Sequence, residues 1–403
     1  MKAIVIGGGA AGFFGAIACA ATHPPVSVTL LEAGRKPLAK VRLSGGGRCN
    51  VTHHCFDPAQ LVQYYPRGGK ALRGAFTRFQ PQDTAAWFES RGVQLKTEAD
   101  GRMFPTTDSS ATIVNCLVNA AVEAGVELRL GAAVKSVCSH GGSFVVQLKS
   151  GETLGSDRLL LATGSNPLGY RWAKELGHSV VPPVPSLFTF NIDDPRLKEL
   201  AGVSVDNVNV RLVGTKLAQS GPLLITHWGI SGPAVLKLSA WGARILHNHC
   251  YRMPVAINWV PGYSAESLRH QLLNIKAQTP RKRVQSYCPL PLPKRLWQQF
   301  VDSVGITQTW AEVSKKQLNR LVDELTQGSY QIDGKGVFKE EFVTCGGVKL
   351  KEVDFKTMAS KCCPGLHLAG EILDVDGVTG GFNFQSAWTT SWLAGRAMGN
   401  RLS

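Results

Sequence analysis

The stretch Lys2-Ala-Ile-Val-Ile-Gly-Gly-Gly-Ala-Ala-Gly12 decides the fold of this chain. After the lysine it opens with a continuous apolar run, which is typical of a parallel strand buried on both faces. The alanine-rich segment Phe13–Ala21 then predicts a helix, and Val26–Leu31 predicts a second strand that ends at Glu32. Together these segments predict one strand–helix–strand unit of about 30 residues, the element from which Rossmann-type sheets are built.

The glycines between the first strand and the helix follow the spacing Gly7-x-Gly9-x-x-Gly12, and Glu32 follows 20 residues after the last of them. The first glycine permits a tight turn, the second lets a pyrophosphate approach the backbone, and the third lets the helix pack on the strand. The phosphates would lie at the positive N-terminus of the helix. Glu32 would accept hydrogen bonds from ribose hydroxyls and repel a 2′-phosphate. A glycine-rich turn without a ligand is the alternative, and it leaves Glu32 unexplained.

A second glycine-rich segment follows, Lys40-Val-Arg-Leu-Ser-Gly-Gly-Gly-Arg-Cys-Asn50. Its three glycines, flanked by Lys40, Ser44 and Arg48, offer backbone donors and cations to a phosphate or to the edge of a flavin. A flexible surface loop is the alternative interpretation. Cys49 is a candidate proton donor beside the cofactor, although a small buried cysteine without a chemical role explains it equally well.

Two later segments end apolar strands in turns of small residues. The first is Leu160-Leu-Ala-Thr-Gly164, where the backbone can pass close to the dinucleotide. The second is Leu368-Ala-Gly-Glu-Ile-Leu-Asp374, followed by Gly377-x-x-Gly380-Gly381-x-Asn383. Its glycine turn precedes the last predicted helix and would point N–H groups at the flavin. Glu371 and Asp374 would hydrogen-bond ribityl hydroxyls, or else act as helix-capping acids.

Composition bounds the class of protein. The chain has 403 residues, 44% of them hydrophobic and 18% charged, which is typical of a globular protein with two domains. Its ten cysteines include no Cys-x-x-Cys pair, and neither Cys362-Cys363 nor His247-x-His249-Cys250 has the ligand spacing of a zinc site. We therefore expect no metal and a reducing, cytoplasmic location. The uncharged run Ala3–Ala21 is too rich in glycine for a signal peptide or a membrane span, so we expect no membrane partner.

The middle of the chain differs in character from its two ends. Pro182, Pro183 and Pro185 predict a joint between domains. From there to about residue 260, short strand-like runs alternate with turns. Residues 265–325 then show helical spacing, and strand and glycine-turn patterns return near Phe342. The middle is thus a small β domain with a helical excursion.

These motifs resemble those of the YhiN/BaiN-like flavoproteins, also called aminoacetone-oxidase-like, over essentially the whole chain. The segments that carry the resemblance are Gly7–Gly12, Ser44–Asn50, Thr226-His-Trp-Gly-Ile-Ser-Gly-Pro233, Phe342-Val-Thr-Cys-Gly-Gly-Val348 and Gly370-Glu-Ile-Leu-Asp-Val-Asp376. One departure is Ser165, where the family has a further glycine. It does not affect the expectation of a cofactor.

The resemblance implies an α/β fold. It consists of a Rossmann-type, glutathione-reductase-like FAD domain in two parts and an inserted β-barrel domain that carries a helical subdomain. We place the FAD domain at residues 1–185 and 342–403, the insert at 186–341, and the helical part at about 262–328. The chemistry implied by the resemblance is mixed. It includes reduction of C=C bonds, among them uracil in large-subunit (23S) ribosomal RNA, and oxidation of small amines.

The charge distribution bears on this choice. The chain has 44 Lys and Arg against 29 Asp and Glu, a net charge of +15. Residues 35–80 hold nine basic residues against Asp57 alone, far more than the roughly two charges of a flavin pyrophosphate require. Aromatic residues interleave with them, which favours stacking on unpaired RNA bases; a solvated basic face with its aromatics in the core is the alternative. The RNA-binding candidates are Arg67, Lys70, Arg73, Arg78, Arg281, Lys282 and Arg283; the aromatics are Tyr64, Tyr65, Phe76 and Phe79.

We therefore expect an FAD-dependent oxidoreductase that reduces an activated C=C bond, foremost uracil to dihydrouridine in ribosomal RNA. NAD(P)H would supply the electrons and bind transiently, because no second dinucleotide fingerprint is present. Cys49 or His227 would donate the proton, although His227 could equally be structural. An oxidase or reductase of a small amine or enone, and an RNA-binding protein with a structural flavin, remain alternatives. The cofactor-binding candidates are Gly7, Gly9, Ala11, Gly12, Glu32, Ala33, Lys40, Ser44, Gly45, Gly46, Arg48, Asn50, Val134, Thr163, Gly164, Gly370, Glu371, Asp374, Gly380, Gly381 and Asn383.

Overall fold

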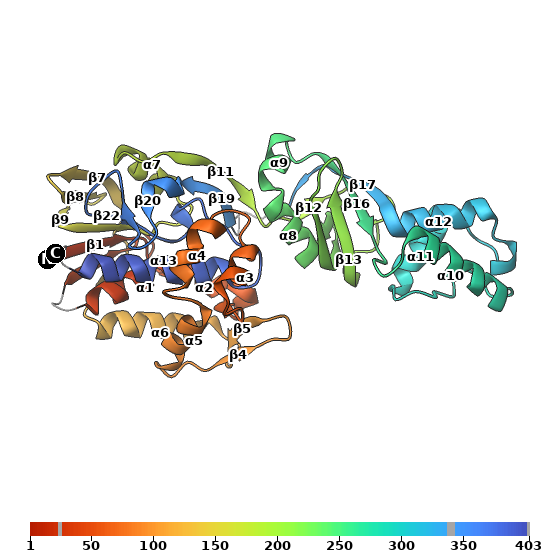
Figure 1. Cartoon of the computed structure of the whole chain (residues 1–403), viewed down its shortest axis with the longest axis horizontal. Coiled ribbons are helices and arrows are strands. Elements are labelled where there is room, and N and C mark those ends of the chain that lie inside the picture. Colours follow the sequence, from red (N-terminus) through yellow and green to blue (C-terminus); the bar gives the residue numbers. More distant parts are fainter. Residues whose placement is uncertain (23–25, 337–342, 401–403) are drawn as a thin grey trace. The chain divides into compact units, whose positions relative to one another are not determined.

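The chain separates into two units, one of which is assembled from both ends of the sequence (Figure 1). The computed structural model describes residues 1–22, 26–336 and 343–400. One unit combines Met1–Val184 with Val343–Ser403, and the other is Pro185–Phe342. The joint expected between residues 185 and 186 lies beside the first division. The joint expected between 341 and 342 falls outside the described residues.

A parallel sheet forms the centre of the unit built from both ends. Its strands are β1 (Lys2–Ile6), β2 (Ser27–Leu31), β6 (Glu127–Arg129), β10 (Arg158–Leu161) and β22 (Leu366–Leu368). They lie in the order β22-β10-β1-β2-β6, and every neighbouring pair is parallel. The strand order reverses at β1, so the carboxyl ends of β1 and its neighbours form the crevice where doubly wound folds bind ligands.

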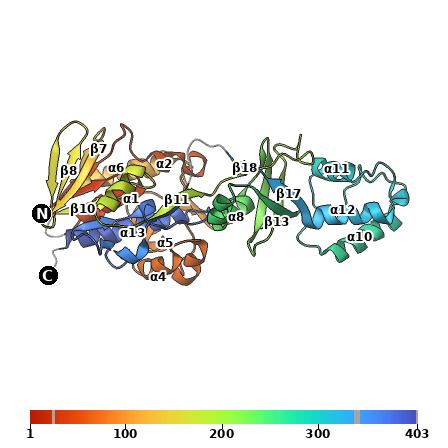
Figure 2. The same cartoon turned by 90° about the horizontal axis from the view of Figure 1, so that it is seen from above.

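Two helices that are far apart in the sequence pack side by side against this sheet. They are α1 (Ala10–Ala20) and α13 (Phe382–Gly399), and both figures of the whole chain show them adjacent (Figures 1 and 2). The contact is backbone on backbone, because a Cβ added at Gly395 would lie 2.3 Å from the Gly15 carbonyl oxygen. Without side chains at these positions the two helices approach closely. The last helix is thus part of the core that the first helix needs.

Smaller elements complete this unit. An antiparallel meander, β7 (Val134–His140), β8 (Ser143–Leu148) and β9 (Thr153–Ser156), lies between β6 and β10 in the sequence. The remaining elements used below are α2 (Ala39–Leu43), β3 (Thr52–His53), α4 (Gly69–Phe76), α6 (Ser110–Glu123), α7 (Pro167–Glu175), a short 3₁₀ turn at Leu350–Glu352 (η4), β20 (Val353–Asp354) and β21 (Ala359–Ser360).

The inserted unit is built on a seven-stranded antiparallel sheet that curls round on itself. Its strand order is β17-β16-β13-β14-β15-β12-β18, so β17 and β18 are the two ends of the order. Yet β17 ends at Ile332 and β18 begins at Gly334. Two edge strands joined by a single residue must lie close together, so the sheet closes into a barrel. The strands are β12 (Phe190–Asn191), β13 (Ser204–Leu212), β14 (Ala218–Thr226), β15 (Gly229–Ser231), β16 (Met253–Asn258), β17 (Gly328–Ile332) and β18 (Gly334–Lys335).

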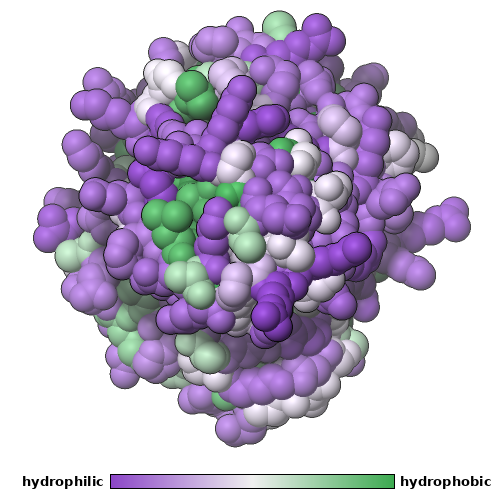
Figure 3. Space-filling model, turned by 90° about the vertical axis from the view of Figure 1, so that its right-hand side faces the viewer, coloured by the Kyte–Doolittle hydropathy of each residue, from purple (hydrophilic) through white to green (hydrophobic). Residues whose placement is uncertain are grey.

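Helices extend the inserted unit. Between β16 and β17 lie α10 (Ala265–Gln278), α11 (Lys294–Ser303) and α12 (Lys315–Gln327), which form the helical subdomain. Trp259, Trp297 and Trp310 are fully enclosed in its core. The face drawn in Figure 3 is mostly hydrophilic, with small separate apolar patches between the polar side chains. No helix among the described residues is long and apolar enough to cross a membrane.

Candidate functional site

The first glycine turn has the geometry that its spacing predicts. Gly7 adopts φ +114°, and a Cβ there would lie 2.4 Å from the Ala162 carbonyl oxygen. A Cβ at Gly12 would lie 1.7 Å from the carbonyl oxygen of Gly7. Any larger residue at Gly7 or Gly12 would therefore clash with the protein backbone, whether or not a ligand is bound. Gly9 is different, because no described atom lies within 4 Å of where its Cβ would be. The space in front of Gly9, at the N-terminus of α1, is open for a phosphate.

Glu32 lies at the end of β2 and is fixed by the same turn. The N–H of Gly8 donates to Oε2 and the N–H of Gly34 donates to Oε1, both at 2.6 Å. Each carboxylate oxygen retains a second lone pair that can accept a ribose hydroxyl. Ala33, the neighbouring candidate, is exposed. The geometry is therefore that expected for an adenosine ribose beside the pyrophosphate turn.

The second glycine segment is anchored to the C-terminal part of the same unit by an ion pair. Lys40 Nζ lies 2.7 Å from Glu371 Oε2, and the N–H of Thr344 donates to Glu371 Oε1 at 3.0 Å. Gly164, after β10, lies against the same carboxylate, because its Cβ would be 3.6 Å from Glu371 Oε2. Four segments of the sequence thus meet at Glu371, and its charge is balanced by Lys40.

The middle of the second segment is open. Gly45, Gly46 and Gly47 have φ of +58°, +69° and +86°, and no described atom lies within 4 Å of a Cβ at Gly46 or Gly47. Arg48 is already engaged. It forms an ion pair with Glu98 at 2.7 Å, and its guanidinium lies 4.0 Å from the ring centre of Phe104. Arg48 therefore supports the loop and would reach a ligand only by leaving these partners.

Cys49 is enclosed by the protein. Its exposed fraction is 0%, and it adopts φ +63°. Burial raises the pKa of its thiol to about 12, although a hydrogen bond with Ser44 opposes this. The thiol is therefore protonated at neutral pH. It has a proton to give, but no exposed surface from which to give it.

The glycine turn before α13 is held against β3. The Asn50 amide accepts from the N–H of Gly381 at 3.0 Å and donates to the carbonyl of Thr52 at 3.0 Å. Asn383 closes the same turn by accepting from the N–H of Gly377 at 2.8 Å and donating to its carbonyl at 2.9 Å. Asn50 and Asn383 thus shape the two glycine-rich segments and bring them together. Gly380 and Gly381 have φ of +129° and +91°.

The remaining cofactor candidates lie on other segments of the same unit. A Cβ at Gly370 would lie 2.8 Å from the Cβ of Ala11. The hydroxyl of Thr163 is buried with no hydrogen-bond partner among the described residues, as is that of Tyr170 in α7. Tyr170 was not predicted, and the charges of Glu371 and Asp374 contribute to raising its pKa after the larger effect of burial. Val134, at the start of β7, is buried. Buried hydroxyls without a partner among the described residues fit a polar ligand.

The basic candidates do not form one group. Arg67 forms a bidentate ion pair with Asp376, whose side chain is completely buried. The charge of Arg67 therefore balances a buried carboxylate of the protein. Lys70, Arg73 and Arg78 are exposed, on α4 and just after it. Arg281, Lys282 and Arg283 are also exposed, in the inserted unit. Of the four aromatics, Tyr65, Phe76 and Phe79 are in the core, and only Tyr64 is exposed, at 37%. For Tyr65, Phe76 and Phe79 the structure therefore supports the alternative interpretation, in which the aromatic residues pack in the core.

His227 lies in the turn between β14 and β15 of the inserted unit and is exposed. Its neighbour Trp228 is 77% exposed, the highest value among the large exposed hydrophobic residues described. The sequence motif Thr226–Pro233 contains this tryptophan, yet nothing in its spacing indicated that the indole would face solvent. An exposed indole is a surface on which a planar ring can stack.

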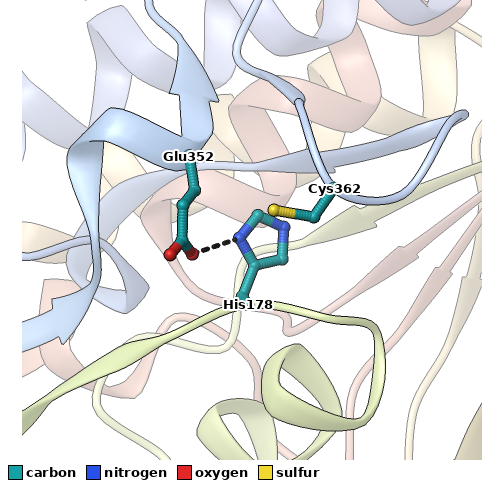
Figure 4. A group of neighbouring side chains, drawn as sticks. All are labelled: His178, Glu352 and Cys362. Atoms are coloured by element: carbon teal, nitrogen blue, oxygen red, sulfur yellow. Dashed lines mark hydrogen bonds and ion pairs between the residues drawn. The ribbon is translucent and has the colours of Figure 1, made fainter.

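One group of side chains was missed by sequence reasoning. His178 follows α7, Glu352 ends η4, and Cys362 follows β21, and their side chains point toward one another (Figure 4). The imidazole Nδ1 lies 3.2 Å from Glu352 Oε2, and Nε2 lies 2.7 Å from Ser360 Oγ. These residues are too widely spaced in the sequence to show a ligand pattern.

A family model described as the HI0933-like protein Rossmann domain matches residues 1–397. The chain belongs to the HI0933-like family. This is the group of FAD-dependent oxidoreductases with a Rossmann-type FAD domain, and the expected fold class is confirmed.

Two relatives of this HI0933-like chain are named ribosomal RNA dihydrouridine synthase. The one from Escherichia coli (strain K12) is 34% identical and covers 97% of this chain and 96% of its own. The one from Haemophilus influenzae is 31% identical and covers 96% of each. A 3-dehydro-bile acid delta(4,6)-reductase from Clostridium scindens is 29% identical and covers 98% of each.

Solved structures support the fold alone. The 3-ketosteroid-delta4-(5alpha)-dehydrogenase from Rhodococcus jostii matches with a TM-score of 0.53 at 13% identity, over 99% of this chain and 97% of its own. The 3-ketosteroid delta1-dehydrogenase from Sterolibacterium denitrificans gives 0.53 at 12% identity, over 98% and 99%.

Proposed function

We propose that this enzyme reduces the C5–C6 bond of uracil in large-subunit (23S) ribosomal RNA to dihydrouridine, with NAD(P)H as the source of electrons. The observation that carries the proposal is the similarity, along almost the full length, to two relatives named ribosomal RNA dihydrouridine synthase. The relative from Escherichia coli, at 34% identity, is more similar in sequence to this chain than the bile-acid reductase, at 29%. The exposed basic residues of both units add support, because ribosomal RNA is a polyanion.

The residues around the first glycine turn would hold FAD. The open backbone at Gly9 and the N-terminus of α1 would bind the pyrophosphate, and Glu32 would bind the adenosine ribose. Lys40, Glu371 and Thr163 would bind the ribityl chain and the flavin edge. Bound FAD supplies hydride transfer between a nicotinamide and an electron-poor carbon. The protein's part is to orient the uracil, exclude water and deliver the proton to C5.

We propose His227 ahead of Cys49 as the proton donor. Position in the sequence favours Cys49, because its loop is the one expected beside the cofactor. A general acid must come within hydrogen-bond reach of the atom it protonates, and the enclosed thiol of Cys49 has no exposed atom. His227 is exposed in a turn beside Trp228, whose indole offers a stacking surface for an unstacked base.

The two donors can be distinguished by separating the half-reactions. In His227→Ala, reduction of the flavin by NAD(P)H should be unchanged, and formation of dihydrouridine should slow by about 100-fold, a typical scale for general acid catalysis. Cys49→Ala, the matched change at the enclosed residue, should leave both half-reactions close to wild type. The reverse pattern would return the role to Cys49. Wild-type product formation in both variants would mean that solvent supplies the proton.

The proposal as a whole is tested by mass spectrometry of ribosomal RNA from cells with and without the gene. Loss of one dihydrouridine from 23S RNA, restored by the wild-type gene, is the expected result. An unchanged modification pattern would refute the proposed substrate.

The second candidate is reduction of a small enone, favoured by the similarity to the bile-acid reductase. Turnover of a steroid enone, with ribosomal RNA unmodified, would select it. Turnover of a small amine would instead select the oxidase alternative. Salt-sensitive RNA binding without turnover of either substrate would leave an RNA-binding protein with a structural flavin.

A further inference from the structure

We propose that His178, Glu352 and Cys362 form a binding site for a divalent cation of the zinc type, separate from the flavin site. The nitrogen, oxygen and sulfur atoms of the three side chains all lie within 4.8 Å of one another. Among the described residues this is the one group of three or more His, Cys, Asp and Glu side chains with that property. Figure 4 shows that they come from three separate segments and converge.

The spacing of the first two ligand atoms suits a metal. His178 Nδ1 and Glu352 Oε2 are 3.2 Å apart. Two ligands that each bind zinc at about 2.0–2.1 Å in tetrahedral geometry lie about 3.3 Å from one another. A cation could therefore take the place of the proton that now joins these two atoms, with little movement of either residue. The ring proton would then reside on Nε2 and be donated to Ser360 Oγ, which would give up one of the two N–H groups it now accepts as the Cys362 loop adjusts.

Cys362 lies on the surface, whereas the other two proposed ligands, His178 and Glu352, are more buried. The side chain of His178 is completely buried, and that of Glu352 is 22% exposed. Cys362 is exposed, on the connection between β21 and β22. Its sulfur can approach the other two atoms by a local adjustment of this surface loop. Solvent reaches the same side, so water would fill the fourth position.

The surroundings of the two fixed ligands are built as metal sites usually are. The imidazole is oriented through Nε2 by Ser360 Oγ at 2.7 Å, and Glu352 accepts the N–H of Ser179 at 2.8 Å. Such second contacts fix the ring and hold the carboxylate before the metal arrives. Burial lowers the pKa of His178, although Glu352 opposes this, so the ring is neutral at pH 7, as a metal ligand must be.

The kind of cation follows from the ligands. One thiolate, one imidazole and one carboxylate favour a borderline ion such as Zn²⁺ over Mg²⁺ or Ca²⁺, which prefer oxygen. The two anionic ligands also balance the charge of a divalent ion. A thiol must lose its proton to bind a metal, so affinity should increase with pH.

A nucleophile activated by a His–Glu pair is the competing interpretation of the same atoms. Ser360 is the hydroxyl closest to Nε2, but its oxygen already accepts the N–H groups of Cys362 at 3.0 Å and Cys363 at 2.8 Å. A serine oxygen with both lone pairs occupied cannot attack a substrate. Ser360 therefore positions the imidazole and the Cys362 loop.

The experiment uses the full chain with its flavin, freed of metal by chelation and dialysis. Zn²⁺ is titrated against a chromophoric chelator, and Co²⁺ is added separately to detect a thiolate-to-cobalt absorption band. We expect one Zn²⁺ per chain, a raised melting temperature with Zn²⁺, and a cobalt–thiolate band. Cys362→Ser should abolish the band and weaken Zn²⁺ binding by about 100-fold or more. This is more than the usual effect of changing a residue that only hydrogen-bonds a metal ligand.

Two further variants keep the result unambiguous. Cys138→Ser, at another exposed cysteine, is the matched control and should bind Zn²⁺ as wild type does. Glu352→Gln keeps an oxygen for the N–H of Ser179 and should still weaken binding. The site is refuted if the wild-type protein takes up no Zn²⁺, or if Cys362→Ser and Cys138→Ser bind it equally. Because Cys362 is exposed, its substitution should not prevent folding, whereas a change at buried His178 could.

Discussion

Gly9 lies just before α1 and Gly12 lies inside the first turn of that helix, and the structure predicts opposite consequences for the same substitution at the two positions. Gly9 has φ −89° and ψ −170°, values that any residue adopts, and no described atom lies within 4 Å of its would-be Cβ. In Gly9→Ala the methyl group therefore meets no protein atom. The free energy of unfolding of the flavin-free protein should rise by about 0.4–1 kcal/mol, because the unfolded chain loses conformational freedom.

The same methyl group occupies the space assigned to the pyrophosphate. Loss of one hydrogen bond to a charged group costs about 1.5–3 kcal/mol, so the affinity for FAD should decrease by about 10- to 150-fold. In Gly12→Ala the Cβ would lie 1.7 Å from the carbonyl oxygen of Gly7. The helix must move away from the strand, and overpacking of this kind destabilises a protein by about 1–3 kcal/mol.

The assay has two parts: fluorescence titration of the flavin-free protein with FAD, and urea unfolding of the same samples. Gly74→Ala, at an exposed position of α4 where no described atom lies within 4 Å of the added Cβ, is the matched control and should leave FAD affinity unchanged. Wild-type affinity in Gly9→Ala would mean that the pyrophosphate does not bind at this turn. Equal destabilisation of Gly9→Ala and Gly12→Ala would refute the distinction between the two glycines.

Three other expectations follow from residues outside this turn. Asp376→Ala would remove the buried carboxylate that pairs with the guanidinium of Arg67, which is only 18% exposed. This change should lower the free energy of unfolding by about 3–5 kcal/mol. The control Asp323→Ala, at an exposed helix position, should change the free energy of unfolding by less than about 0.5 kcal/mol. Burial lowers the pKa of His367 to about 4 in the folded protein, whereas its pKa in the unfolded chain is about 6.5. As the pH falls below about 6.5, the unfolded chain therefore binds this proton before the folded protein does, and the folded state becomes less stable. Urea unfolding should therefore show a loss of about 2 kcal/mol between pH 7 and pH 5 that His367→Gln lacks. Arg73→Glu with Arg78→Glu should weaken RNA binding and flatten its salt dependence without lowering FAD content, whereas the equal charge change Lys135→Glu with Lys149→Glu should not; equal effects of the two pairs would point to net charge alone.

Local patterns in the sequence were enough to predict the sheet that holds the dinucleotide crevice. The expected strand at Lys2–Ile6 coincides with β1, because a buried parallel strand is a continuous apolar run. The expected helix at Phe13–Ala21 begins three residues late, since α1 starts at Ala10. Gly12 was interpreted as part of the turn, whereas it lies inside the helix, where contact with Gly7 requires it.

Long-range pairing is what the sequence could not show. Arg67 was grouped with the basic residues around it, but its partner Asp376 lies 309 positions away and is completely buried. His178 and Glu352 are likewise far apart in the sequence. By contrast, the burial of Phe76 was available to sequence reasoning, because Leu72 and Phe76 are four residues apart on one face of a helix. Charge counts identify a basic segment, but only the fold shows which of its charges already have partners.

The packing of α13 on α1 has a consequence during synthesis of the chain. Strands β1, β2, β6 and β10 leave the ribosome early, but β22, Glu371 and the turn at Gly380 come after the entire inserted unit. About 220 residues separate β10 from α13, which corresponds to roughly 10–45 s at typical rates of translation. For that time the face of α1 that receives Gly395 is uncovered, and the crevice has only one of its two sides. We therefore expect flavin binding to begin only when the end of the chain has docked, and a nascent chain that stops within the insert to remain without its cofactor.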